Sequence, residues 1–90
     1  MSNYVLITGG SDGIGLELAK LFAKDKHNLV LAARNIEKLN KAKEMLNNEG
    51  IDVRIISVDL SSMKECEKLI NYIEDNNLLV DILVNNAGIG

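Results

Sequence analysis

The chain has 90 residues, which is enough for one small domain with a modest core. With 47% hydrophobic and 26% charged residues it has the composition of a soluble globular protein, and its net charge of −3 argues against non-specific nucleic-acid binding. No apolar run approaches the ~20 residues of a membrane span, and the first residues lack the basic and apolar regions of a signal peptide. Since Cys66 is the only cysteine, we expect a reducing, cytoplasmic compartment and no membrane partner.

The first half of the chain alternates strand and helix signals. Residues 4–8 are predicted to form a strand and residues 12–24 a helix. Residues 29–33 are a continuous apolar run, which is typical of a strand covered on both faces. The apolar residues of the predicted helix recur at helical spacing and are expected to face the core: Ile14, Leu18, Leu21 and Phe22.

The second half repeats this alternation. Asn35 has the character of an N-cap for a helix that ends near residue 48, with Gly50 as its C-terminal glycine. Ser62, with Glu65 three residues later, resembles a capping box for a third helix. The residues expected to face inward are Ile36, Leu39, Ala42 and Leu46 in the second helix and Met63, Cys66, Leu69, Ile70 and Ile73 in the third.

Strands are also predicted at residues 53–58 and 80–84, so the order of elements is βαβαβαβ. Helical connections between strands imply an α/β fold with a parallel sheet and right-handed crossovers. The expected strand order is 3-2-1-4. Ligands of such sheets bind beyond the carboxyl ends of the strands, at the switch point between strands one and four.

A glycine-rich loop joins the first strand to the first helix. Gly9 permits a sharp turn, Gly13 leaves room for a pyrophosphate, and Gly15 lets the helix pack closely on its strand. Backbone N–H groups and the helix dipole at such a loop favour a phosphate. The loop lacks the Gly-Lys-Ser/Thr ending of a P-loop, so an NTPase is disfavoured.

The end of the second strand indicates the type of dinucleotide. An acidic residue there would accept hydrogen bonds from the ribose 2′-hydroxyl and select NAD. This chain has Ala33 followed by Arg34, whose guanidinium can bind a 2′-phosphate in a bidentate manner. We therefore expect NADP rather than NAD. The same absence of an acid disfavours a nucleotide-binding methyltransferase.

Three side chains have a plain structural interpretation beside a functional one. Asp12 is unfavourable at an anion site, and we expect it to cap the first helix or to point to solvent. His27 lies in a polar turn away from the predicted crevice, so a catalytic role is not expected. Cys66 lies on an apolar stripe and is interpreted as a small core residue. No pair of residues has metal-ligand spacing.

Three ordered motifs resemble those of the short-chain dehydrogenase/reductase family. Residues 8–15 (TGGSDGIG) resemble its glycine-rich signature, Asp59-Leu60 its adenine-contacting pair, and residues 81–88 (DILVNNAG) its NNAG segment. The resemblance implies a partial Rossmann fold over residues 1–90, truncated after the fourth strand, that binds a dinucleotide for hydride transfer between NADPH and a carbonyl or alcohol. The cofactor-binding residues that it implies are Gly9, Gly10, Ser11, Asp12, Gly13, Ile14, Gly15, Arg34, Asp59, Leu60, Asn85, Ala87 and Gly88.

The family's catalytic serine and its Tyr-x-x-x-Lys pair follow the NNAG segment, and this chain has no match for them. Its only tyrosines are Tyr4, which begins the first strand, and Tyr72, on the third helix. No catalytic residue is therefore assigned, and the chain is expected to be inactive alone. The alternative is a non-catalytic nucleotide-binding or self-associating module. The fourth strand, apolar over residues 82–84, is expected to be an exposed edge through which the chain forms a homo-oligomer.

Overall fold

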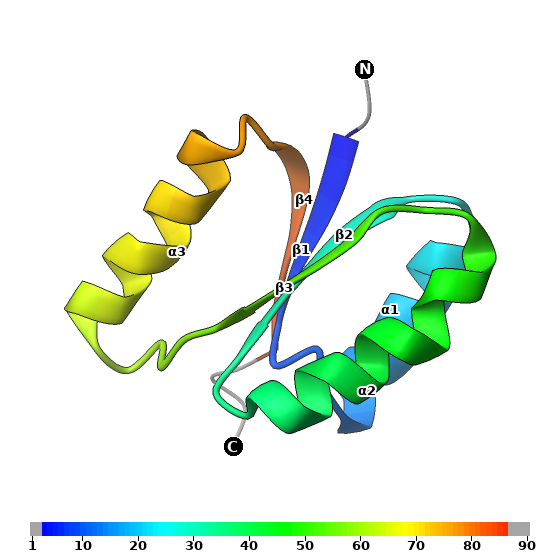
Figure 1. Cartoon of the computed structure of the whole chain (residues 1–90), viewed down its shortest axis with the longest axis horizontal. Helices are drawn as coiled ribbons and strands as arrows, with labels where there is room; N and C mark the ends of the chain where they lie inside the picture. Colours follow the sequence, from blue (N-terminus) through cyan, green and yellow to red (C-terminus); the bar gives the residue numbers. More distant parts are fainter. Residues whose placement is uncertain (1–2, 87–90) are drawn as a thin grey trace.

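Four parallel strands form one sheet in the predicted order β3-β2-β1-β4 (Figure 1). The computed structural model describes residues 3–86, apart from the side chain of Asn48. The strands are β1 (Asn3–Thr8), β2 (Asn28–Ala33), β3 (Val53–Ser57) and β4 (Leu79–Asn85), and the helices are α1 (Gly13–Lys24), α2 (Ile36–Leu46) and α3 (Met63–Asp75). A 3₁₀ turn, η1 (Asn47–Glu49), extends α2.

Helices cover both faces of the sheet, with α1 and α2 on one side and α3 on the other (Figure 1). Successive residues of β1 serve opposite faces: Val5 and Ile7 belong to the core under α1 and α2, whereas Leu6 belongs to the core under α3. The central strand β2 is buried on both faces, as its continuous apolar run predicted. The two cores hold the carboxyl ends of β1, β2 and β3 in fixed register.

The predicted inner face of α1 is only partly correct, because Phe22 is half-buried against the core whereas Ile14 and Leu21 are exposed. Ile14 and Leu21 are 68% and 60% exposed, and the residues of α1 that are buried are Gly15, Ala19 and Ala23. These small residues recur every four positions and so form one stripe along the helix. They let α1 approach the sheet closely, and Ile14 and Leu21 lie outside the contact.

The predicted caps of α2 and α3 are present. The Asn35 side chain accepts a hydrogen bond from the N–H of Lys38 at 3.1 Å, and Gly50 has a left-handed conformation with φ of 75°. Ser62 Oγ accepts from the N–H of Glu65 at 3.4 Å. The Glu65 carboxylate does not return to Ser62 as a full capping box requires. It accepts from the N–H of Asp59 at 3.2 Å.

The inner face of α3 is narrower than its apolar stripe. Leu69 is buried, whereas Met63 and Ile70 are 82% and 53% exposed. At about 100° per residue, Met63 and Ile70 lie roughly 100–120° around the helix from Leu69, beyond the reach of the sheet. Ile36, at the first position of α2, is likewise exposed. Apolar periodicity therefore located these helices correctly but overestimated how much of each is buried.

The sheet ends in β3 on one side and β4 on the other. Burial alternates along β4: Leu83 is 63% exposed, while Ile82 and Val84 are half-buried against the core under α1 and α2. The prediction of an exposed apolar edge is thus correct for Leu83 and only partly so for its neighbours. Within residues 3–86, no helix has both the length and the apolar character needed to cross a bilayer.

Candidate dinucleotide-binding site

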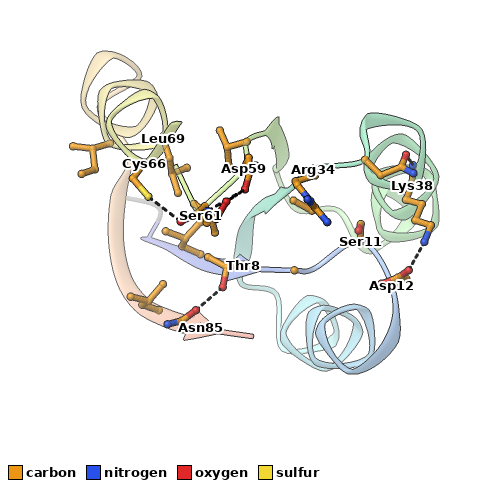
Figure 2. A pocket seen from close by; sticks show the side chains of 18 residues that line it. Thr8, Ser11, Asp12, Arg34, Lys38, Asp59, Ser61, Cys66, Leu69 and Asn85 are labelled. Atoms are coloured by element: carbon orange, nitrogen blue, oxygen red, sulfur yellow. Dashed lines mark hydrogen bonds and ion pairs between the residues drawn. The ribbon is translucent and has the colours of Figure 1, made fainter. Parts of the chain in front are cut away.

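A cavity of about 920 Å³ lies at the carboxyl ends of the strands, where β1 and β4 adjoin (Figure 2). It is lined by segments that are far apart in the sequence. These segments are the end of β1 with the loop after it, the turn from β2 into α2, the turn from β3 into α3, one side of α3, and β4. The lining residues are Leu6, Thr8, Gly9, Ser11, Asp12, Ala33, Arg34, Asn35, Lys38, Val58, Asp59, Leu60, Ser61, Cys66, Leu69, Ile70, Leu83 and Asn85.

The glycine loop turns sharply out of β1 and passes directly into α1. Gly9 has a φ of 69° and its N–H donates to the carbonyl of Ala32 at 2.7 Å, which fixes the loop against β2. Gly10 is buried, and a Cβ there would lie 3.0 Å from the side chain of Leu31. The first three residues of α1 are Gly13, Ile14 and Gly15, of which none is among the residues that line the cavity.

The start of α1 has the features of an anion site. The first backbone bond within the helix runs from the N–H of Leu16 to the carbonyl of Asp12 at 3.2 Å. The N–H groups before Leu16 therefore have no partner within the helix, and they lie at the positive end of its dipole. Asp12 occupies the N-cap position but makes no side-chain cap bond to them.

Asp12 occupies the N-cap position and is largely exposed, in line with the two predicted alternatives, but its side chain forms an ion pair with α2 and not a cap bond. Its Oδ2 accepts from Nζ of Lys38 at 2.7 Å, in a contact that joins the glycine loop to the first turn of α2. Lys38 was not among the residues predicted for the site. Asp12 and Lys38 are 26 positions apart in the sequence, and their contact depends on how α1 and α2 pack. No local sequence pattern therefore predicts it.

Arg34 lines the same cavity as this pair (Figure 2). Its backbone is anchored because Ser57 Oγ donates to the Arg34 carbonyl at 2.8 Å. Its side chain is exposed, and within residues 3–86 its guanidinium forms no ion pair. The site thus presents one unpaired cation at the end of β2.

Asp59 is held at the end of β3 by its own turn. Its Oδ1 accepts from the N–H of Ser61 at 3.0 Å and from Ser61 Oγ at 2.7 Å. The hydroxyl and then the N–H of Ser61 lower the pKa of Asp59, and the positive charge of Arg34 adds to the effect. Asp59 is therefore a carboxylate at neutral pH. Next to it, Leu60 is half-buried and its carbonyl accepts a bond from Sγ of Cys66 at 3.4 Å.

Thr8 ties the end of β1 to the end of β4. Its hydroxyl donates to Oδ1 of Asn85 at 3.1 Å and accepts from the N–H of Asn86 at 2.9 Å. Nδ2 of Asn86 in turn donates to the carbonyl of Gly9 at 3.4 Å. These bonds join the glycine loop to the end of β4. Ala87 and Gly88, also predicted to bind cofactor, lie outside the described residues.

The cavity brings together much of the predicted site: Gly9, Ser11, Asp12, Arg34, Asp59, Leu60 and Asn85. The cavity also includes Cys66. This residue was predicted to lie in the core, but it is half-buried in the cavity wall. His27 is not part of it and packs edge-on against Phe22, with ring centroids 5.6 Å apart.

Parallel strands in the order 3-2-1-4, alternating helices and a glycine loop at the switch point define a Rossmann-like α/β domain. Residues 3–90 match the family model for short chain dehydrogenases. The chain belongs to this family, as the three motifs predicted.

The chain is 44% identical over 87 residues to the very-long-chain 3-oxoacyl-CoA reductase of Kluyveromyces lactis, covering 94% of this chain and 25% of that protein. Similar solved structures include L-sorbose reductase of Gluconobacter frateurii with NADPH and L-sorbose (TM-score 0.92, 36% identity, 99% of this chain and 34% of that one). Another is a short-chain dehydrogenase of Sphingobium yanoikuyae with NADPH (TM-score 0.83, 34% identity, 94% and 34%). The chain thus spans about a quarter to a third of the length of the relatives it matches.

Proposed function

We propose that this chain is the NADP(H)-binding portion of an oxidoreductase that transfers a hydride between the nicotinamide and a carbonyl or alcohol. The observation that carries the proposal is that the glycine loop and Arg34 line one cavity at the carboxyl ends of the strands. Gly9 and Ser11 of the loop, which leads into α1, are among the lining residues, and Arg34 forms no ion pair within residues 3–86. Similar solved structures hold NADPH, which supports the same cofactor here.

The pyrophosphate is assigned to the loop of residues 9–15. Its charge would be met by the free N–H groups in the first turn of α1 and by the helix dipole. Arg34 is assigned to the 2′-phosphate, because Ala33 leaves no carboxylate at the end of β2 to repel it. Asp59 and Leu60 are assigned to the adenine, and Asn85 to the adjacent ribose. Ala87 and Gly88 complete the predicted set.

Calorimetric titration of the chain with NADPH and NADH tests the proposal. We expect NADPH to bind more tightly than NADH, and Arg34→Ala to remove the preference by weakening NADPH alone. Lys41→Ala is the matched control, since Lys41 is an exposed cation of α2 that does not line the cavity. Equal affinities for the two dinucleotides, or no binding of either, would contradict the assignment of Arg34.

Turnover by the 90-residue chain is a separate question. None of its residues matches the family's catalytic serine or Tyr-x-x-x-Lys pair, so we propose that it binds cofactor without oxidising it. An assay of NADPH oxidation with a panel of carbonyl compounds is expected to give only the background rate. Oxidation above background would show that this chain carries catalytic groups of its own.

A self-associating module remains the alternative function, and β4 is the feature that favours it. Within residues 3–86 this edge strand exposes Leu83 and has no neighbouring strand on its outer side, which makes it a template for a second copy. The competing occupant is a further strand of a longer polypeptide, because the relatives extend well beyond the matched region. Light scattering at micromolar concentration is expected to give a dimer, and Leu83→Lys a monomer. A monomeric mass for the unmodified chain contradicts this proposal.

The cytoplasmic location of the chain stays a prediction.

A further inference from the structure

The ion pair between Asp12 and Lys38 sits where the proposed 2′-phosphate site meets the glycine loop. Both side chains line the same cavity as Arg34, and their charged atoms are 2.7 Å apart. Figure 2 shows Arg34 and Lys38 extending toward the loop that carries Ser11 and Asp12. The pair is accessible to solvent, with side-chain exposures of 53% for Lys38 and 61% for Asp12. A ligand entering the cavity can therefore reach it.

The stability of α2 does not explain why a basic residue stands at position 38. Lys38 is in the first turn of α2, where the helix dipole disfavours positive charge. Asn35 caps this turn through the N–H of Lys38, which holds the backbone whatever the side chain is. Asp12 likewise makes no cap bond to α1. An exposed pair of this kind adds at most about 1 kcal/mol to stability.

We propose that Lys38 is a second cation for the 2′-phosphate of NADP(H), and that Asp12 competes with that phosphate for Lys38. The proposal rests on the proposed function. A ribose 2′-phosphate carries nearly two negative charges at neutral pH. Arg34 and Lys38 together match this charge, whereas the carboxylate of Asp12 opposes it. When the phosphate binds, the ammonium of Lys38 turns from Asp12 to the phosphate oxygens, and no covalent bond changes.

Asp12 thereby sets how strongly the site selects the phosphorylated cofactor. In the free protein the carboxylate of Asp12 is paired with the ammonium of Lys38. This ion pair must separate before Lys38 can bind the phosphate, which weakens the binding of the phosphate. A ligand without the 2′-phosphate leaves the pair intact. Removing the carboxylate should therefore increase the preference for the 2′-phosphate, although the substitution deletes an ion pair.

The test uses adenosine 2′,5′-bisphosphate and 5′-AMP as probes, since they differ only in the 2′-phosphate. Calorimetry gives the dissociation constant of each probe, and the readout is the ratio of the two constants. An effect of Asp12 on the 5′-phosphate, which both probes carry, cancels in this ratio. Asp12→Asn is expected to raise the preference for the bisphosphate about two- to fivefold, and Lys38→Met to lower it by a similar factor. Lys38→Arg should retain it. Lys41→Met is the control for loss of a remote charge.

A double-mutant cycle distinguishes competition from independent effects. Under the proposal, Lys38→Met lowers the preference more in the Asp12→Asn background than in the unmodified chain. An unchanged ratio in Asp12→Asn and Lys38→Met overturns the proposal, and so does a lower ratio in Asp12→Asn. If Arg34→Ala still removes the preference in that case, the proposed function stands. Circular dichroism shows which variants are folded. If no folded variant binds either probe or either dinucleotide, the proposed function and the proposal for Lys38 and Asp12 are both wrong.

Discussion

Gly15 lies so close to Gly9 that a Cβ at residue 15 would be 2.1 Å from the Gly9 carbonyl oxygen. The same Cβ would be 3.0 Å from Nδ2 of Asn86, which itself donates to that carbonyl. Real carbon and oxygen atoms do not approach this closely without bonding. The first turn of α1 can therefore sit under the loop only because residue 15 has no side chain, and this contact sets the shape of the loop.

Gly15→Ala should distort the glycine loop. We expect it to lower the free energy of unfolding by about 1–3 kcal/mol, as overpacking does, and to weaken NADPH binding more than tenfold. Urea unfolding and calorimetry measure the two effects. Gly50→Ala is the control: Gly50 has a φ of 75°, which an alanine adopts only with strain, but a Cβ there would meet no atom within 4 Å. It should cost about 1–2 kcal/mol and leave cofactor affinity unchanged in the folded protein. Normal NADPH affinity in Gly15→Ala would contradict this account.

Local rules predicted the frame of this fold well. The strand order follows from the alternation of elements, and the caps at Asn35 and Ser62 need only neighbours three residues away. Helix faces were less predictable, because periodicity counts large apolar residues. It missed that α1 packs through small residues such as Ala19 and Ala23 and leaves Leu21 outside.

The candidate site was predictable to a similar extent. Arg34 was identified because it directly follows a strand, and Asp59 because Asp59-Leu60 resembles a family motif. Both line the cavity, since parallel strands end at the same edge of a sheet. Lys38 was missed because its place in the site depends on how α2 lies beside the glycine loop. The partner of Asp12 was missed for the same reason, since a side chain's charge does not specify a contact 26 residues away.

Thr8→Val should destabilise the switch point between β1 and β4. The substitution keeps the shape of the side chain but removes the hydroxyl, so the N–H of Asn86 loses the acceptor that it has at 2.9 Å. Leaving such a partly buried donor unpaired costs about 1–3 kcal/mol. Urea unfolding should show this loss, and Thr8→Ser should recover most of the stability. Equal stabilities for Thr8→Val and the unmodified protein would mean that water replaces the hydroxyl.

A polar cluster at the opposite end of the sheet links β1, the turn before β3 and β3 itself. The hydroxyl of Tyr4 donates to Asp52, and Nε of Arg54 donates to the same carboxylate at 2.9 Å. Burial alone would raise the pKa of Asp52, but the bonds from Tyr4 and Arg54 outweigh it and lower that pKa below 3.8. Burial and then the bond to Asp52 raise the pKa of Tyr4 above 10.0.

Stability should therefore fall at both ends of the pH scale. The contribution of Asp52 is fully present above its unfolded-state pKa near 3.8 and is lost as pH falls through the lower folded value. That of Tyr4 is present below about pH 10 and is lost as pH rises through the higher folded value. In urea unfolding, Asp52→Asn should flatten the acid limb and Tyr4→Phe the alkaline limb. Glu44→Gln, which alters an exposed carboxylate of α2, should leave the alkaline limb unchanged.

Asn35→Ala should affect both stability and the candidate site. Its side chain accepts the N–H of Lys38 at 3.1 Å, and removing an N-cap of this kind costs about 1 kcal/mol. The first turn of α2 should then fray, which moves Lys38 away from Asp12 and the cavity. We therefore expect weaker selection of adenosine 2′,5′-bisphosphate over 5′-AMP in Asn35→Ala, measured by calorimetry. Ser62→Ala removes the comparable cap of α3, whose acceptor distance is 3.4 Å, and should cost stability without changing the selection. If Asn35→Ala and Ser62→Ala changed the selection equally, general loosening of the fold would explain the change, and displacement of Lys38 would not be its cause.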